Sequence, residues 1–129
     1  MNLTLTLLDG TFVIHRLAPD AQIPADVLSS HFFAVTRTDD ELSLMLPDSV
    51  KIASDKSDSD WACFKVEGPL EFELVGVLAG ISSVLAQAEV SIFALSTFDT
   101  DYILVKREQV GAAKEALTSA GYQVRQGDK

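Results

Sequence analysis

The sequence predicts an α+β fold made of two related units, each with an antiparallel sheet and helices on one face. Three observations lead to this prediction. Residues 33–45 resemble residues 93–105 at an offset of 60 positions. After residue 60 the expected elements follow the order strand, helix, strand, strand, helix, strand. Finally, 47% of the 129 residues are hydrophobic, which is enough for a buried core.

The internal repeat aligns FAVTRTDDELSLM with FALSTFDTDYILV, so Phe33 pairs with Phe93 and Glu41 with Asp101. In each copy an apolar run ends in hydroxyl side chains, passes through an acidic turn and resumes as a second apolar run. This pattern is typical of a β-hairpin. Duplicated units usually pack side by side, so we expect a pseudo-symmetric interface and a pocket there.

The first half of the chain is expected to hold short elements and then a linker. These are strands at 3–8 and 12–17 joined by a tight Asp9-Gly10 turn, a helix at 25–29, and strands at 31–37 and 42–46. The polar run SDKSDSD at 54–60 is typical of a linker. We therefore predict a degenerate N-terminal unit at residues 1–60 and a second unit at residues 61–129.

The second half shows stronger patterns. Expected elements are a strand at 61–67, a helix at 71–87, strands at 90–97 and 102–106, a helix at 108–119 and a strand at 122–125. Glu71 and Glu73 would complement the dipole in the first turn of the long helix, and Gly121 would end the second helix. Gly76 and Gly80 would allow close packing of the long helix.

Composition argues against several classes of function. A net charge of −9 disfavours nucleic-acid binding, and the scattered Lys and Arg residues predict no anionic-membrane surface. No signal peptide or membrane span is recognisable, so a soluble cytoplasmic protein is expected. Cys63 has no zinc-binding spacing around it and is interpreted as a small core residue. We predict no cofactor and no metal.

Catalytic signals are also weak. His15 and His31 are isolated, and no nucleophile-elbow, phosphate-loop or zinc-protease motif occurs. We therefore predict that the protein is not an enzyme, and an enzyme of unknown type stays open as a third hypothesis.

The segment WACFKVEGPLEFELVGVLAGISSVLAQAEVSIFALSTFDTDYILV, with TRTDDELSLM upstream, resembles the ACT domain in its bacterial tandem form, which is related to aspartokinase regulatory domains and cytosolic arginine sensors. The resemblance is most specific at residues 96–102 and 68–76. It implies two tandem ferredoxin-like βαββαβ units and a sensor that binds a small molecule, usually an amino acid, where two units meet. It further implies a regulated partner protein and no chemistry of its own. It also implies a homodimer, or as the alternative a tandem whose two units pair within one chain.

A free amino acid needs amide donors for its carboxylate and an acceptor for its ammonium. The start of the long helix offers unpaired amides, Asp101 could receive the ammonium, and hydroxyls could add contacts. The expected ligand-binding residues are Glu71, Phe72, Leu74, Ser96, Thr97, Phe98 and Asp101.

Alternatives remain for these residues. Asp99 and Asp101 could be turn residues, Ser96 and Thr97 could be strand-end hydroxyls, and Phe98 could be core rather than pocket wall. Arginine-sensing relatives carry an acidic residue at the place of Leu74, which implies a ligand with an apolar or small polar side chain. The alternative function is an assembly module that uses ACT-like sheets for oligomerisation without a ligand.

Overall fold

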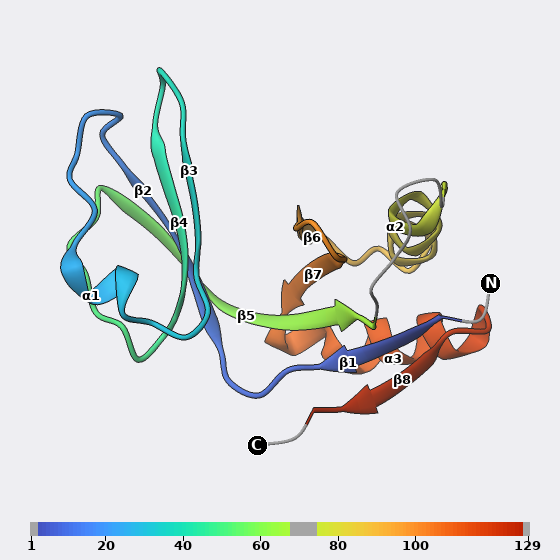
Figure 1. Ribbon diagram of the computed structural model, residues 1–129. Helices are drawn as coiled ribbons and strands as arrows, with labels where there is room; N and C mark the ends of the chain where they lie inside the picture. The colour runs from blue at the N-terminus through green and yellow to red at the C-terminus, as the bar shows by residue number, and fades with distance from the viewer. Residues whose placement is uncertain (1–2, 68–74, 128–129) are drawn as a thin grey trace. The chain divides into compact units, whose positions relative to one another are not determined.

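The computed structural model describes residues 3–67 and 75–127, which belong to two compact units (Figure 1). The inserted unit is Gly10–Trp61, and the large unit combines Met1–Asp9 with Ala62–Lys129. The sequence placed the first nine residues in the N-terminal unit. They belong instead to the large unit, because strand β1 (Thr4–Leu7) pairs with β5 (Lys56–Val66) and β8 (Gln123–Gln126).

The inserted unit is a four-stranded antiparallel sheet with one short helix. Its elements are β2 (Phe12–Leu17), α1 (Ala25–Leu28), β3 (Ala34–Arg37), β4 (Leu42–Pro47) and the first part of β5. The strand order is β3-β4-β2-β5. Leu42, Leu44 and Leu46 alternate along β4 and pack with Val27 of α1, as the two-residue period of a strand requires. No helix joins β4 to β5, and the connection packs Val50 and Ile52 on this cluster instead.

The predicted linker is wrong, because residues 56–60 form the first half of strand β5. This half pairs with β2, with His15 opposite Ser57 and Arg16 opposite Lys56. All five side chains are exposed, so no alternation of apolar residues marked the strand. This stretch ends in a β-bulge at residues 59 and 60, where the register shifts and Asp60 adopts a positive φ of 66°. The chain therefore passes from one unit to the other inside a continuous strand.

The large unit has a five-stranded mixed sheet rather than the expected four-stranded antiparallel one. Its remaining elements are α2 (Val77–Gln87), β6 (Ile92–Ser96), β7 (Asp101–Lys106), η1 (Arg107–Gln109) and α3 (Val110–Ser119). The strands follow the order β6-β7-β5-β1-β8. Strand β1 lies between β5 and β8 (Figure 1), antiparallel to the first and parallel to the second. The βαββαβ order is thus present, with one strand added from the N-terminus.

The two helices of the large unit cover one face of its sheet. Alternate residues of three strands pack with α2 and α3 in a single buried cluster that includes Leu5, Leu7, Ala62, Phe64, Val66, Ile81, Leu85, Ile103, Val105, Ala113 and Leu117. Gly80 allows close packing as expected: a Cβ there would lie 2.9 Å from the hydroxyl of Tyr122. The same expectation for Gly76 is wrong, because a Cβ there would meet nothing within 4 Å. Gly121 follows α3 with a φ of +99°, which confirms its helix-ending role.

Two local predictions are wrong. Helix α2 begins at Val77 rather than at residue 71, because Gly76 adopts a left-handed φ of 82° at its N-cap. Its first turn holds no acidic residue, and Glu71 and Glu73 lie outside the described residues. Strands β1 and β2 do not form the expected hairpin. Both pair with β5 in succession, and Gly10, at φ +95°, lies in the bend between them.

Candidate functional site

The repeated hairpins β3–β4 and β6–β7 have the same four-residue turn. The Thr38 amide donates to the Glu41 carbonyl at 2.9 Å, and the Thr97 amide donates to the Thr100 carbonyl at 2.8 Å. Each threonine hydroxyl also accepts from the amide three residues ahead, at 3.2 Å and 3.4 Å respectively. The turn geometry therefore repeats in the fold, as the sequence predicted for the hairpins.

The equivalence between the turns runs at an offset of 59, not 60. The pairs that close the turns are Arg37 with Leu42 and Ser96 with Asp101. The same offset matches core-facing positions, for example Leu44 with Ile103. A shift of one residue moves a side chain to the other face of a strand. Asp101 therefore corresponds to Leu42, and its pairing with Glu41 in the sequence was wrong.

Asp101 is a half-buried carboxylate at the end of the turn in the large unit. The Ser96 hydroxyl donates to its Oδ1 atom at 2.5 Å. Within residues 3–67 and 75–127, Asp101 forms no ion pair with a lysine or arginine. One carboxylate oxygen is thus held by a hydroxyl, which leaves the negative charge available to a cationic group. The Ser96 hydroxyl serves to hold this carboxylate.

Thr100 anchors the same turn to the end of β5. Its side chain is buried, and its hydroxyl donates to the Val66 carbonyl at 2.5 Å. This bond places the turn beside the beginning of the connection between β5 and α2. Sequence reasoning missed Thr100, because a hydroxyl in an exposed-looking turn carries no signal of its long-range partner.

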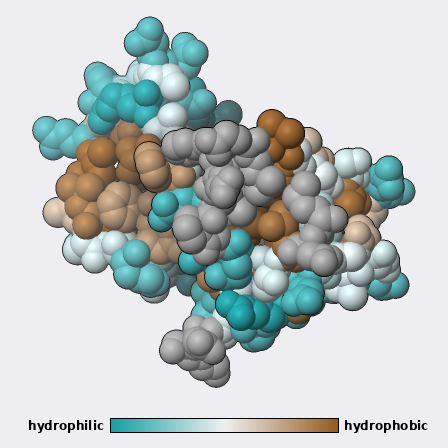
Figure 2. Space-filling view, turned by 45° about the vertical axis from the view of Figure 1, so that its right-hand side comes forward, coloured by the Kyte–Doolittle hydropathy of each residue, from teal (hydrophilic) through white to brown (hydrophobic). Residues whose placement is uncertain are grey.

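Phe98 is not a core residue, because 79% of its surface is exposed. The reading of Phe98 as core is therefore wrong. Val75, just before α2, is 82% exposed. Figure 2 shows that hydrophobic and hydrophilic residues lie side by side on this view of the surface. Thr97 is exposed as well. The sequence-predicted residues Ser96, Thr97, Phe98 and Asp101 thus share one turn, whereas Glu71, Phe72 and Leu74 lie outside the described residues.

The equivalent turn of the inserted unit has different chemistry. Arg37 stands in the position of Ser96, and its guanidinium donates to the carbonyls of Pro19 and Ala21, at 2.7 Å for the latter. Leu42 stands in the position of Asp101 and is fully buried. The β3–β4 hairpin is therefore tied to the connection between β2 and α1, and this end of the unit lacks the carboxylate.

A second polar cluster links three chain segments of the large unit. The Thr6 hydroxyl donates to Glu67 Oε2 at 2.5 Å and accepts from Arg125 Nε at 3.0 Å. Arg125 also lies 3.7 Å from Glu67 Oε1. This cluster ties β1 and β8 to the residue that follows β5.

Of the remaining candidate catalytic groups, His15 and Cys63 are buried, whereas His31 is exposed. His15 Nδ1 lies 2.9 Å from the Ser54 hydroxyl, and burial lowers the pKa of His15. Burial raises the pKa of the Cys63 thiol to about 12, which keeps it protonated and unreactive. The part of the chain that the structure describes contains no group of three metal-ligating side chains. In the same residues, no helix has the length and apolar character needed to cross a bilayer.

Comparison with family models shows what kind of protein has this fold. Residues 56–119 match the model of the ACT domain, from the first residue of β5 to the last of α3. A second model, described as an N-terminal domain, matches residues 10–50. The chain belongs to the ACT domain family.

Individual relatives agree with this assignment. "Cytosolic arginine sensor for mTORC1 subunit 1" of Pongo abelii is 30% identical over 122 residues, which are 87% of this chain and 37% of that protein. The chain thus spans little more than a third of these curated relatives. The crystal structure of protein Atu0741 from Agobacterium tumefaciens has a TM-score of 0.91 and 33% identity, covering 100% of this chain and 96% of the other.

A more distant structure shares the fold alone. The regulatory subunit of aspartate kinase from Thermus thermophilus has a TM-score of 0.64 and 14% identity, over 90% of this chain and 96% of that one.

Proposed function

We propose that this protein is a regulatory sensor that binds an amino acid beside the β6–β7 turn. Family membership and relatives named as a sensor and as a regulatory subunit support a regulatory small-molecule-binding role. The choice of an amino acid as ligand rests on the state of the Asp101 carboxylate. It is a half-buried carboxylate held by Ser96 and left without an ion pair among the described residues, as the acceptor of a ligand ammonium would be.

The ligand carboxylate needs donors close to Asp101. The Thr100 bond to Val66 supports a site at this end of the sheet, where the chain leaves β5 toward α2. Helix α2 has no side-chain cap and no acidic residue in its first turn, so its first amides favour an anion. We include Glu71, Phe72 and Leu74 from the sequence, with Thr97 and Phe98 as contacts from the turn.

We also propose that the inserted unit, Gly10–Trp61, is a trimmed ACT unit, so that the chain is a tandem of this unit and the large unit. Its strand order and its repeated turn support this interpretation. Because Arg37 and Leu42 replace Ser96 and Asp101, we expect one site of this kind per chain. A homodimer, a regulated partner protein and a cytoplasmic location belong to the same proposal.

No chemistry of its own is assigned to the protein, because its named relatives are sensors and regulatory subunits. The alternative function is an assembly module without a ligand. The exposed side chains of Phe98 and Val75 favour it, because a sheet-extending partner would cover apolar groups of this size.

Thermal denaturation in the presence of each of the twenty amino acids tests the proposal. A ligand at 100 times its dissociation constant adds about 2.7 kcal/mol, which corresponds to a shift of several degrees in Tm. We expect the shift for one or a few amino acids and its loss in Asp101→Ala. Asp99→Ala is the matched control, because Asp99 is exposed in the same turn and has no polar partner within the described residues.

Isothermal titration of any stabilising amino acid then gives the number of sites. A site whose binding heat is lost in Asp101→Ala supports the assignment to the large unit. If no amino acid shifts Tm, or if Asp99→Ala abolishes the shift as completely as Asp101→Ala, the proposed site is wrong. Oligomerisation that depends on protein concentration and is lost in Phe98→Ser would then support the assembly module.

A further inference from the structure

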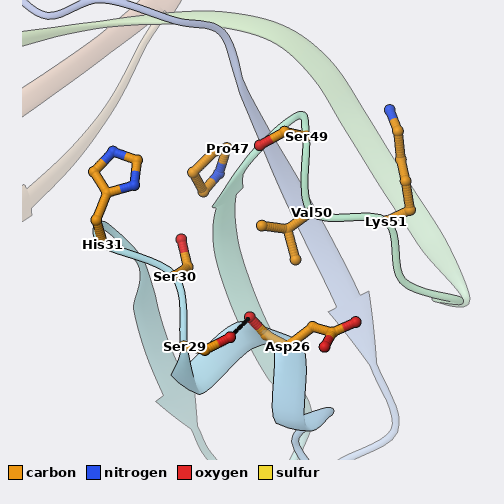
Figure 3. A pocket seen from close by; sticks show the side chains of 8 residues that line it. All are labelled: Asp26, Ser29, Ser30, His31, Pro47, Ser49, Val50 and Lys51. Atoms are coloured by element: carbon orange, nitrogen blue, oxygen red, sulfur yellow. Dashed lines mark hydrogen bonds between the residues drawn. The ribbon is translucent and has the colours of Figure 1, made fainter.

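The inserted unit contains a hollow beside its short helix. In the large unit, η1 and α3 join β7 to β8 and cover the sheet next to α2. In the inserted unit, residues 48–55 join β4 to β5 without a helix. Val50 and Ile52 fill part of the space over the sheet. An open hollow of about 420 Å3 remains between the end of α1 and this connection (Figure 3).

The wall formed by the end of α1 is rich in hydroxyls and held in place by local bonds. The Ser29 hydroxyl donates to the Asp26 carbonyl at 3.1 Å, and the Ser30 hydroxyl donates to the Phe32 carbonyl at 3.1 Å. Their oxygen lone pairs remain able to accept hydrogen bonds. His31 follows them at the rim (Figure 3). This side of the hollow is therefore polar and locally ordered.

Opposite charges come from the two sides of the hollow. Asp26 belongs to α1, whereas Lys51 belongs to the connection between β4 and β5. Within residues 3–67 and 75–127, neither side chain has an ion-pair partner. The Ser49 hydroxyl has no hydrogen-bond partner among the same residues. Val50 supplies an apolar surface between these polar groups (Figure 3). The volume lies within the range of small-molecule sites.

We propose that this hollow is a second binding site, for a small zwitterion with an ammonium and a carboxylate group. Asp26 receives the ammonium and the Ser49 hydroxyl receives the carboxylate. The exposed Lys51 side chain, which extends away from both in Figure 3, turns toward the carboxylate of the bound ligand. Two unpaired opposite charges suit a zwitterion better than an anion, which Asp26 would repel, or a cation, which Lys51 would repel. The site is separate from the proposed one at Asp101, because all its lining residues belong to the inserted unit.

The affinity of this site follows from its exposure. Asp26, His31, Ser49 and Lys51 are all exposed, and exposed ion pairs are weak because water screens them. We therefore expect a dissociation constant of about 1 mM. Removal of either charge should weaken binding about two- to fivefold, in keeping with measured exposed pairs.

Site-resolved NMR tests the proposal. The uniformly nitrogen-labelled full chain is titrated separately with each of the twenty amino acids, and the amide signals of Ser29, Ser30, His31, Ser49 and Lys51 are followed. We expect these signals to shift and saturate for at least one amino acid. Lys51→Ala and Asp26→Asn should weaken the response, while Lys56→Ala, an exposed lysine outside the hollow, should leave it unchanged.

The Asp101→Ala variant separates this site from the proposed sensor site. Its signals at the hollow should respond as in the unmodified protein. If only the amide signals of residues 96–101 shift, the second site is overturned and the proposed function stands. If only the signals of the hollow shift, the second site stands and the proposed site at Asp101 is overturned. The second site is also overturned if the hollow signals of Lys51→Ala and Asp26→Asn saturate at the same amino-acid concentration as those of the unmodified protein.

Discussion

Thr100→Val tests whether the bond between the turn and β5 stabilises the large unit. Thr100 is 5% exposed, and its hydroxyl lies 2.5 Å from the Val66 carbonyl. Valine has nearly the same shape, so the change removes a donor without leaving a cavity. A buried acceptor that loses its partner costs about 1–3 kcal/mol. For a chain of this size, that lowers Tm by about 4–12 °C.

Urea and thermal unfolding of the variant measure this cost. Thr100→Ser keeps the hydroxyl and loses one methyl group, worth about 0.8 kcal/mol, so it should be the milder change. Thr118→Val, at an exposed position of α3, should change stability by less than about 0.5 kcal/mol. If Thr100→Val is as stable as the unmodified protein while Thr100→Ser is not, the hydrogen bond has no stabilising role. The amino-acid affinity should also fall in Thr100→Val, because the turn that carries Asp101 loses its anchor.

Three further outcomes are expected. Gly80→Ala and Gly111→Ala both gain about 0.5–1 kcal/mol of helix propensity. At Gly80 the new Cβ also clashes with the Tyr122 hydroxyl, whereas at Gly111 it meets nothing within 4 Å. Gly80→Ala should therefore be less stable than Gly111→Ala by about 1–3 kcal/mol, and urea melts showing equal effects would contradict this. Burial lowers the pKa of His15, so below about pH 6.5 the unfolded state binds more protons and stability falls. In His15→Leu the difference in Tm between about pH 7 and pH 5 should be smaller. An unchanged difference would show that His15 does not cause the loss of stability. Cys63, fully buried with a pKa of about 12, should react with a thiol reagent only in denaturant, so rapid labelling of the folded protein would be inconsistent with its burial.

Secondary structure was predictable where an element buries apolar side chains that mark it in the sequence. Strand β2 covers residues 12–17, as predicted, and β7 and α3 lie within one or two residues of their predicted ranges. Each of these elements carries buried apolar side chains, so its hydrophobic residues marked its position in the sequence. Residues 56–60 show the opposite case. Their side chains are all exposed, and only backbone hydrogen bonds to β2 make them a strand.

The candidate site was predictable only in part. Ser96, Thr97, Phe98 and Asp101 were found because hydroxyls and acids cluster in a recognisable turn, and that turn exists. The role of Asp101 depended on its partner Ser96, and the position of the turn depended on Thr100, which contacts a carbonyl 34 positions earlier in the chain. Such a contact leaves no trace in local sequence.

The sequence by itself determined the βαββαβ order and the repeated hairpin, because these follow from local periodicity and from residue types at fixed spacing. Its resemblance to the ACT domain identified the family. Tertiary structure decided the rest. It placed β1 between β5 and β8, carried β5 through the predicted linker, and set the equivalence of the two turns at 59 positions. Strand neighbours and register are chosen by which faces become buried together and by backbone hydrogen bonds, which any sequence can form. For that reason two equivalent positions differ in environment: Asp101 accepts a hydrogen bond from Ser96 at its turn, whereas Leu42 of the inserted unit is buried in the core.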